Sequence, residues 1–143
     1  MIVGTTGTVP PYSYYKGTDL NGYDIELARR FAAWLGAGLE FSVYDFGGII
    51  PAAAAGKIDC IMSNLEVDTE RQENFTFSDP VFEQPVGIMV RSEKKLPTDQ
   101  KSSLSDLFSL DGVRIGTQTG TSFGPMLEKK LPGCTNQLFQ FDD

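Results

Sequence analysis

The sequence predicts an α/β fold with an open, largely parallel sheet, and two observations carry this prediction. Strand-like apolar runs alternate with helical patterns across residues 2–63, in the order strand, helix, strand, helix, strand. Strands separated by helices pair in parallel through right-handed crossovers. The alternation restarts after the polar stretch 92–106, which indicates a boundary between two lobes.

The amino-terminal elements follow from local patterns. Residues 2–5 predict a short strand, and the Pro- and Gly-rich stretch 7–22 predicts an irregular loop that is rich in tyrosine. A helix is expected from residue 21, with Gly36 as its stop signal. Its predicted buried face comprises Leu27, Ala28, Phe31 and Leu35.

Two further strands flank a second helix. The alternating run 39–44 predicts a half-buried strand, and the apolar run 57–63 predicts another. Between them, Pro51 is expected in the first turn of a short helix and Gly56 at its end. An additional strand is predicted at 86–91.

The loops that follow these strands are the first candidates for a binding site. Parallel α/β sheets bind ligands at the carboxyl ends of their strands. The loops at those ends are 5–14, 45–48 and 63–71. Packing explains these three stretches least well, and we expect them to line one crevice.

The second lobe repeats the pattern around a glycine turn. A strand at 112–117 is expected to lead through this turn into a helix at 122–131, and a further strand is expected at 136–141. The first amides of such a helix are unpaired and favour a small anion. Capping of the helix by the hydroxyl of Thr121 or Ser122 is the competing interpretation.

Composition excludes several classes of protein. The 143 residues carry a formal charge of −7 and no run of Lys or Arg, so nucleic acid is not an expected partner. The chain has no histidine and its two cysteines lie far apart, which excludes the usual zinc, haem, Ser/His and Cys/His sites. Therefore no metal and no cofactor are expected. No stretch reaches the roughly 20 apolar residues of a membrane helix, and any export signal is expected to have been removed.

Arg71 breaks a local rule. The segment 68–72, DTERQ, predicts a short helix with Thr69 as N-cap and Gln72 completing a capping box. Arg71 then stands near the second helical position, where the helix dipole disfavours a cation. Two interpretations have equal weight, a structural ion pair or the binding of an anionic ligand. The candidate ion-pair partners are Glu66, Glu70 and Glu73.

Five segments together closely resemble the amino-acid-binding extracellular solute-binding proteins, family 3, which have the type II periplasmic-binding-protein fold. The segments are PPYSY at 10–14, GYDIELARRFAAWLG at 22–36, DFGGIIPAAAAGKID at 45–59, DTERQENFTFSDP at 68–80 and IGTQTGTS at 115–122. The resemblance spans nearly the whole chain and keeps order and spacing. It is therefore far more specific than any single motif.

The resemblance implies two α/β lobes that hold a free amino acid between them and deliver it to the membrane permease of an ABC transporter. Residues 1–91 would form a nearly complete first lobe with the first hinge strand, and 92–143 the amino-terminal part of a second lobe. The family continues beyond this point, so the resemblance implies a chain truncated at its carboxyl end. It also implies a periplasmic or extracellular location and no enzymatic activity.

The resemblance assigns a binding site for the ligand carboxylate. Arg71 would clamp the α-carboxylate with its guanidinium fork. The amides around Gly120, Thr121 and Ser122 would hold the same group from the second lobe. Gln118 matches a position that contacts polar side chains in some members of the family.

The first lobe would complete the implied site. Phe46 and Tyr12 would pack near the ligand side chain. Asn64 and Glu66 match positions that meet the α-amino group, where Glu66 replaces a common threonine or serine. It would pair with the ammonium group or neutralise the carboxylate-binding arginine. Thr6 also departs from the family pattern, because many members have aspartate there.

Two alternative functions stay open. The same fold serves as the amino-acid-sensing domain of membrane signalling proteins, and the full gene would distinguish a sensor from a transporter component. Cyclohexadienyl and arogenate dehydratases also resemble this fold, and Glu66 would then be the general acid. Because a lobe without its returning strand exposes sheet edges, we expect either a homo-oligomer of the fragment or opened lobes, with weak amino-acid affinity.

Overall fold

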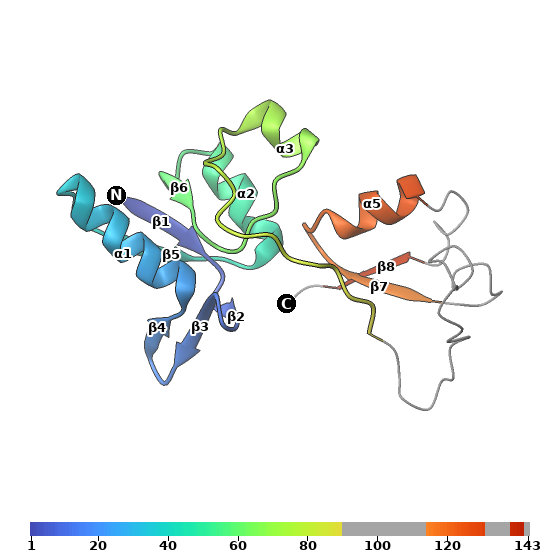
Figure 1. The fold of residues 1–143 in the computed structure, drawn as a ribbon, viewed down its shortest axis with the longest axis horizontal. Coiled ribbons are helices and arrows are strands. Elements are labelled where there is room, and N and C mark those ends of the chain that lie inside the picture. Colours follow the sequence, from blue (N-terminus) through green and yellow to red (C-terminus); the bar gives the residue numbers. More distant parts are fainter. Residues whose placement is uncertain (90–113, 131–137, 142–143) are drawn as a thin grey trace.

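The computed structural model describes residues 1–89, 114–130 and 138–141 (Figure 1). The amino-terminal part holds a parallel and a small antiparallel sheet, and the described residues from 114 onward hold a second parallel strand pair. The elements are β1 Ile2–Thr5, β2 Thr8–Val9, β3 Ser13–Lys16, β4 Asp19–Asn21, α1 Tyr23–Leu35, β5 Glu40–Val43, α2 Phe46–Ala54, β6 Cys60–Ile61, α3 Thr69–Asn74, β7 Ile115–Gln118, α5 Phe123–Lys130 and β8 Leu138–Phe141.

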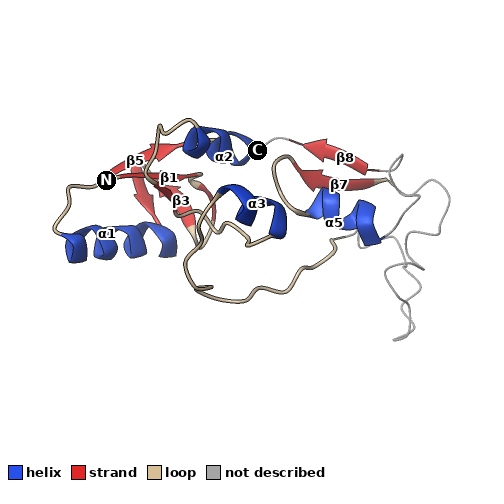
Figure 2. Ribbon diagram, turned by 90° about the horizontal axis from the view of Figure 1, so that it is seen from above, coloured by secondary structure: helices blue, strands red, loops and turns tan. Residues whose placement is uncertain are grey.

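The predicted parallel α/β sheet is confirmed. β1 lies between β5 and β6 and pairs with both in parallel, with Val3 opposite Phe41 on one side and Cys60 on the other. Helices α1 and α2 lie on opposite faces of this sheet (Figure 2), and Val3 is fully buried. The carboxyl ends of the three strands share one edge, so the loops that follow them begin side by side.

The core of the first part lies where α2 packs on the sheet. A buried cluster contains Ile49, Ala52 and Ile58. Pro51 is the sixth residue of α2, whereas the sequence predicted it in the first turn. The helix begins at Phe46, and the burial of Phe46 and Ile49 outweighs the loss of the one helical hydrogen bond that proline cannot donate.

Helix α1 ends where predicted but buries a different face. Gly36 adopts the left-handed conformation, with φ 65, and ends the helix. The buried apolar residues are Ile25, Ala28 and Ala32. Leu27 is half-buried, whereas Phe31 and Leu35 of the predicted face are 38% and 50% exposed. Phe31 lies outside this buried face and stacks on Trp34, with ring centroids 6.0 Å apart.

Residues 8–21 form a small antiparallel sheet where the sequence predicted an irregular loop. Lys16 pairs with Asp19 and leaves a two-residue turn at Gly17 and Thr18, with Gly17 at φ 66. Tyrosine and threonine favour extended, half-buried strands. Here that preference outweighed the Pro and Gly content that predicted a loop.

The described residues of the second part agree with their predicted elements. β7 and β8 pair in parallel, with Gly116 opposite Phe139, and α5 contacts β7. The strand predicted at 86–91 is not formed by residues 86–89, which have no neighbouring strand to pair with among the described residues. Its last two residues and the predicted boundary at 92–106 lie outside the described part of the chain.

Within residues 1–89, 114–130 and 138–141, no helix has the length and apolar character needed to cross a membrane.

Backbone carbonyls, and no side chain, cap the start of α1. The amide of Tyr23 donates to Pro11 O at 3.0 Å. The amide of Asp24 donates to Tyr12 O at 2.9 Å. Gly22 has φ 128, and a Cβ at this position would collide with the Tyr12 carbonyl. Glycine at position 22 therefore lets the tyrosine-rich segment close onto the helix.

We expect Gly22→Ala to lower the free energy of unfolding by about 2–4 kcal/mol, because the added carbon combines a steric clash with backbone strain. The matched control is Gly17→Ala, which also has positive φ but open space around it, and should cost only about 1 kcal/mol. Urea denaturation of both variants measures the difference. Equal losses would contradict the close approach inferred at Gly22.

Candidate functional site

The ion-pair partner of Arg71 is Asp68, which the sequence analysis did not predict. The carboxylate of Asp68 accepts the backbone N–H of Arg71 at 2.9 Å and caps α3, in place of Thr69. Its second oxygen lies 3.1 Å from Nε of Arg71, so the ion-pair partner is Asp68 and not one of the three predicted glutamates. Asp68 takes both roles because its backbone is extended and its side chain has two acceptor oxygens.

The guanidinium of Arg71 joins two segments that are distant in sequence. Nη1 donates to the backbone carbonyl of Glu66 at 2.9 Å, and Nη2 donates to the carbonyl of Gly120 at 2.8 Å. Arg71 is only 8% exposed. A cation in such an environment is stable only when acceptors surround it, so these bonds link the loop before α3 to the turn after β7.

The turn around Gly120 makes a second contact with the first part of the chain. The hydroxyl of Ser122 donates to the carboxylate of Glu66. The hydroxyl of Thr121 stays within the turn and donates to the carbonyl of Gln118 at 2.7 Å. Gly120 has φ 80, in the left-handed region. The predicted glycine turn is therefore present, and the two hydroxyls are donors to Gln118 and Glu66.

Two glycines bring this turn against α2. A Cβ on Gly120 would lie 2.8 Å from Cα of Gly47, so backbone meets backbone here. Phe46, the first residue of α2, is 8% exposed, and its carbonyl oxygen lies 3.4 Å from the same Cβ position. Phe46 is thus beside the turn.

Hydroxyl groups fix the chain at the carboxyl end of β1. Thr5 donates to Ser13 at 2.7 Å, and Ser63 donates to Thr6 at 3.1 Å. The amide of Thr6 donates back to Ser63, and that of Gly7 donates to Ser13. Thr6 is 2% exposed, so it lies inside a buried network and not on an accessible surface.

Asp24 shapes the site, and sequence reasoning missed it. It belongs to the first turn of α1, is 5% exposed, and accepts the backbone N–H of Asn64 at 2.7 Å. Asn64 has φ 48, a conformation uncommon for residues with a side chain. Burial raises the pKa of Asp24, and the hydrogen bond from Asn64 opposes that rise. The signal in the sequence was the position of Asp24 next to the apolar Ile25 in the first helical turn, which could have indicated a buried acid.

An aromatic group forms beside the antiparallel sheet. Tyr12 stacks on Phe82, with ring centroids 5.0 Å apart and planes 13° apart. Tyr23 meets the edge of the same Phe82 ring at 6.0 Å. Phe82 lies in the segment after α3 and was not among the predicted site residues. The apolar residue itself was visible in the sequence, but nothing local indicated that Tyr12 would be its partner.

The structure brings part of the predicted site together. The residues joined by direct hydrogen bonds between the two parts of the chain are Arg71, Glu66, Gly120 and Ser122. Gln118 and Thr121 belong to the same turn. Asn64 is held from α1, whereas Tyr12 and Thr6 engage the other partners described above.

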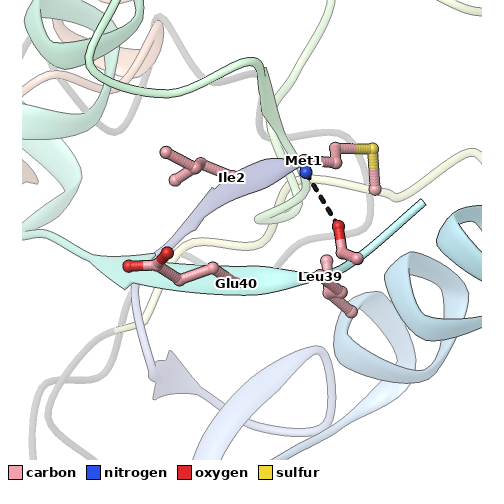
Figure 3. A pocket seen from close by; sticks show the side chains of 5 residues that line it. Met1, Ile2, Leu39 and Glu40 are labelled. Atoms are coloured by element: carbon pink, nitrogen blue, oxygen red, sulfur yellow. Dashed lines mark hydrogen bonds between the residues drawn. The ribbon is translucent and has the colours of Figure 1, made fainter.

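A separate open pocket lies at the opposite, amino end of β1 (Figure 3). It has a volume of about 300 Å³ and is lined by Met1, Ile2, Gly38, Leu39 and Glu40. The amino group of Met1 donates to the carbonyl of Gly38 at 2.8 Å across it. No predicted site residue lines this pocket. Across the described residues, no cluster of His, Cys, Asp and Glu could hold a metal ion.

Comparison with known protein families identifies the class. The family of bacterial extracellular solute-binding proteins, family 3, matches residues 1–134. The chain therefore belongs to this family of amino-acid-binding solute-binding proteins.

The chain is similar to several binding proteins. The arginine-binding extracellular protein ArtP of Bacillus subtilis is 29% identical over 121 residues, which is 85% of this chain and 44% of ArtP. The L-cystine-binding protein TcyJ of Escherichia coli is 23% identical over 144 residues, which is 99% of this chain and 52% of TcyJ. The chain thus spans about half the length of these relatives.

Solved structures support the same fold. One is the ancestral amino-acid-binding protein AncCDT-1, described as a precursor of cyclohexadienyl dehydratase. It is 30% identical with a TM-score of 0.82, and the match covers 99% of this chain and 60% of the AncCDT-1 chain. Arginine-binding holo ArgBP of T. maritima has a TM-score of 0.81 and 28% identity, covering 100% and 60%. The arginine-bound domain 1 of that protein is 34% identical, with a TM-score of 0.56, and covers 57% of this chain and 66% of its own.

We expect Asp24→Asn to be more stable than the wild type at neutral pH, with a difference that grows as pH rises. The pKa of Asp24 is raised in the folded state, so its protonated form stabilises the fold. This contribution is fully present below the ordinary pKa of aspartate, and it is lost as pH rises through the raised folded-state pKa. Asparagine keeps an acceptor for the Asn64 amide and has no charge to bury. Urea denaturation of both proteins from pH 3 to pH 7 is the measurement.

The control for this prediction is Asp24→Ala. It leaves the Asn64 amide without its acceptor and should be about 1–3 kcal/mol less stable than Asp24→Asn at every pH, because neither variant titrates at this position. A difference between Asp24→Asn and the wild type that stays constant with pH would contradict the inferred titration.

Proposed function

We propose that this chain is the ligand-binding part of an extracytoplasmic amino-acid receptor that serves an ABC transporter. Family membership supports this proposal, as do relatives named for binding arginine, histidine and cystine and one named as an ABC transporter extracellular-binding protein. The names of these relatives also support a location on the outer face of the bacterial membrane. Its partners would be a free amino acid and the transporter permease.

One observation carries the proposal. The buried guanidinium of Arg71 reaches across to the Gly120 turn, so a single cation faces both parts of the chain. In the structure, Nη2 donates to a neutral carbonyl. A carboxylate is a charged acceptor that forms shorter and stronger bonds with guanidinium. The α-carboxylate of an amino acid would therefore replace the Gly120 carbonyl at Arg71.

The other predicted site residues take supporting roles in this proposal. Glu66 would exchange the Ser122 hydroxyl for the ligand α-amino group, an exchange that pairs two opposite charges. The amides of Gly120, Thr121 and Ser122 would hold the carboxylate from the second part, and Gln118 would face polar ligand side chains. Tyr12 and Phe46 would contact the ligand side chain, and Asn64 its amino group.

The proposal includes two lobes, at 1–91 and 92–143, that close on the ligand. The separate parallel sheets on the two sides of residue 90 support this division. The solved domain 1 of T. maritima ArgBP, described as arginine-bound, supports the idea that the first lobe carries much of the binding surface. No chemical step is required, because the receptor only binds and releases its ligand.

Arg71→Lys should weaken amino-acid binding by about 1.5–3 kcal/mol, the scale of a hydrogen bond to a charged group, because lysine keeps the charge but loses the planar fork. Calorimetry with L-arginine, L-histidine, L-cystine and L-glutamine as the panel is the measurement. The matched control is Arg30→Lys, whose side chain is 77% exposed on α1 and should leave affinity unchanged. Unchanged affinity in Arg71→Lys together with a lower melting temperature would assign Arg71 a structural role only.

A dehydratase activity is the second candidate, because AncCDT-1 is described as a precursor of cyclohexadienyl dehydratase. Glu66 would be its general acid. We expect no turnover of prephenate or arogenate, since the Glu66 carboxylate already accepts the Ser122 hydroxyl and Arg71 contacts Glu66 at its backbone carbonyl. Turnover that is abolished in Glu66→Gln would overturn the receptor proposal.

A further inference from the structure

Asp68 contacts Arg71 at both its backbone and its side chain. Oδ1 accepts the Arg71 amide at 2.9 Å, and Oδ2 lies 3.1 Å from Nε. The Arg71 side chain is 9% exposed and that of Asp68 is 28% exposed, so the pair is largely shielded from water. Helix capping alone does not require this arrangement, because serine or asparagine would cap α3 as well as aspartate does, and threonine also caps favourably. The second oxygen therefore serves the guanidinium.

Two contacts of the Arg71 guanidinium are made within its own loop, and the third reaches a distant segment and could be exchanged for a ligand. Asp68 holds Nε and the Glu66 carbonyl holds Nη1, and both belong to the loop that leads directly into α3. The remaining contact, from Nη2 to Gly120, reaches a segment 49 residues away. A planar guanidinium held at Nε and Nη1 has its orientation set, with Nη2 directed toward the Gly120 turn.

We propose that Asp68 is a positioning residue, which orients the Arg71 fork so that Nη2 faces the carboxylate of a bound amino acid. This inference rests on the proposed function, because it assumes that Arg71 meets the ligand. It goes further by assigning a role to a residue outside the predicted site. Positioning side chains act through the group they orient, and removing such a partner from a metal-binding histidine costs about 10- to 100-fold in affinity.

Positioning and simple electrostatics predict opposite results. Asp68 brings a negative charge close to the place where a carboxylate would bind, so its charge alone opposes the ligand. If charge dominates, removing the carboxylate tightens binding. If orientation dominates, removing it weakens binding because the guanidinium can rotate away from the productive geometry.

The test uses Asp68→Thr, which retains a favourable N-cap for α3 but cannot hold Nε. The matched control is Glu70→Gln, an exposed acid two residues further along the chain. Calorimetry with L-arginine, L-histidine, L-cystine and L-glutamine, at a temperature where both proteins are folded, should show about tenfold weaker binding in Asp68→Thr. The melting temperature of this variant should fall, because Nε of the buried guanidinium loses its acceptor. Equal or tighter binding would overturn the inference.

A ligand-independent readout separates this inference from the proposed function. In ¹⁵N-labelled wild type, the Nε–H signal of Arg71, assigned by its loss in Arg71→Lys, should be protected from solvent exchange. It should lose this protection in Asp68→Thr and keep it in Glu70→Gln. Retained protection in Asp68→Thr would overturn the positioning role. A wild type that binds no member of the panel would overturn the proposed function, and with it the ligand role of Asp68, whatever the signal shows.

Discussion

A buried guanidinium needs acceptors on every side, and this requirement ties the candidate site together. Arg71 is 8% exposed and contacts one carboxylate and one carbonyl from its own loop, and one carbonyl from a turn 49 residues away. Losing any of these acceptors would leave a charged donor without compensation in a shielded place. The loop before α3 must therefore wrap around the side chain, and the second part of the chain must present the Gly120 turn at this point.

Local periodicity was sufficient to predict the elements that carry the site. The alternation of strands and helices predicted β1, α1, β5, α2 and β6 in order, since each has its own hydrophobic pattern. Arg71 stood out because a cation in a first helical turn opposes the dipole. The structure supplies the reason it is tolerated, which is the Asp68 carboxylate. The sequence favoured Thr69 as N-cap, although both residue types cap well. In the structure Asp68 accepts the Arg71 amide and also pairs with Nε.

The features that were missed depend on partners distant in the chain. The Asp24 bond to Asn64 spans 40 residues, and the Ser63 bonds to Thr6 span 57. No local pattern encodes such pairings, although each residue type was plainly present. The exposed side of α1 was misjudged for a related reason. Helical spacing specifies which residues share a face, but not which face is covered, and here Ala28 and Ala32 are buried whereas the larger Phe31 is exposed.

The close backbone approach of Gly47 and Gly120 limits how much nearer the start of α2 and the turn after β7 can come to each other. With no side chain on either residue, the start of α2 and the turn after β7 are already at backbone contact, and nothing remains there to compress. In the proposed receptor, closing of the two parts would end where hard atoms meet, so this pair would set the shortest separation between them. The size of a ligand held there would then be limited by distances measured from this contact, and not by how tightly the surrounding charges attract.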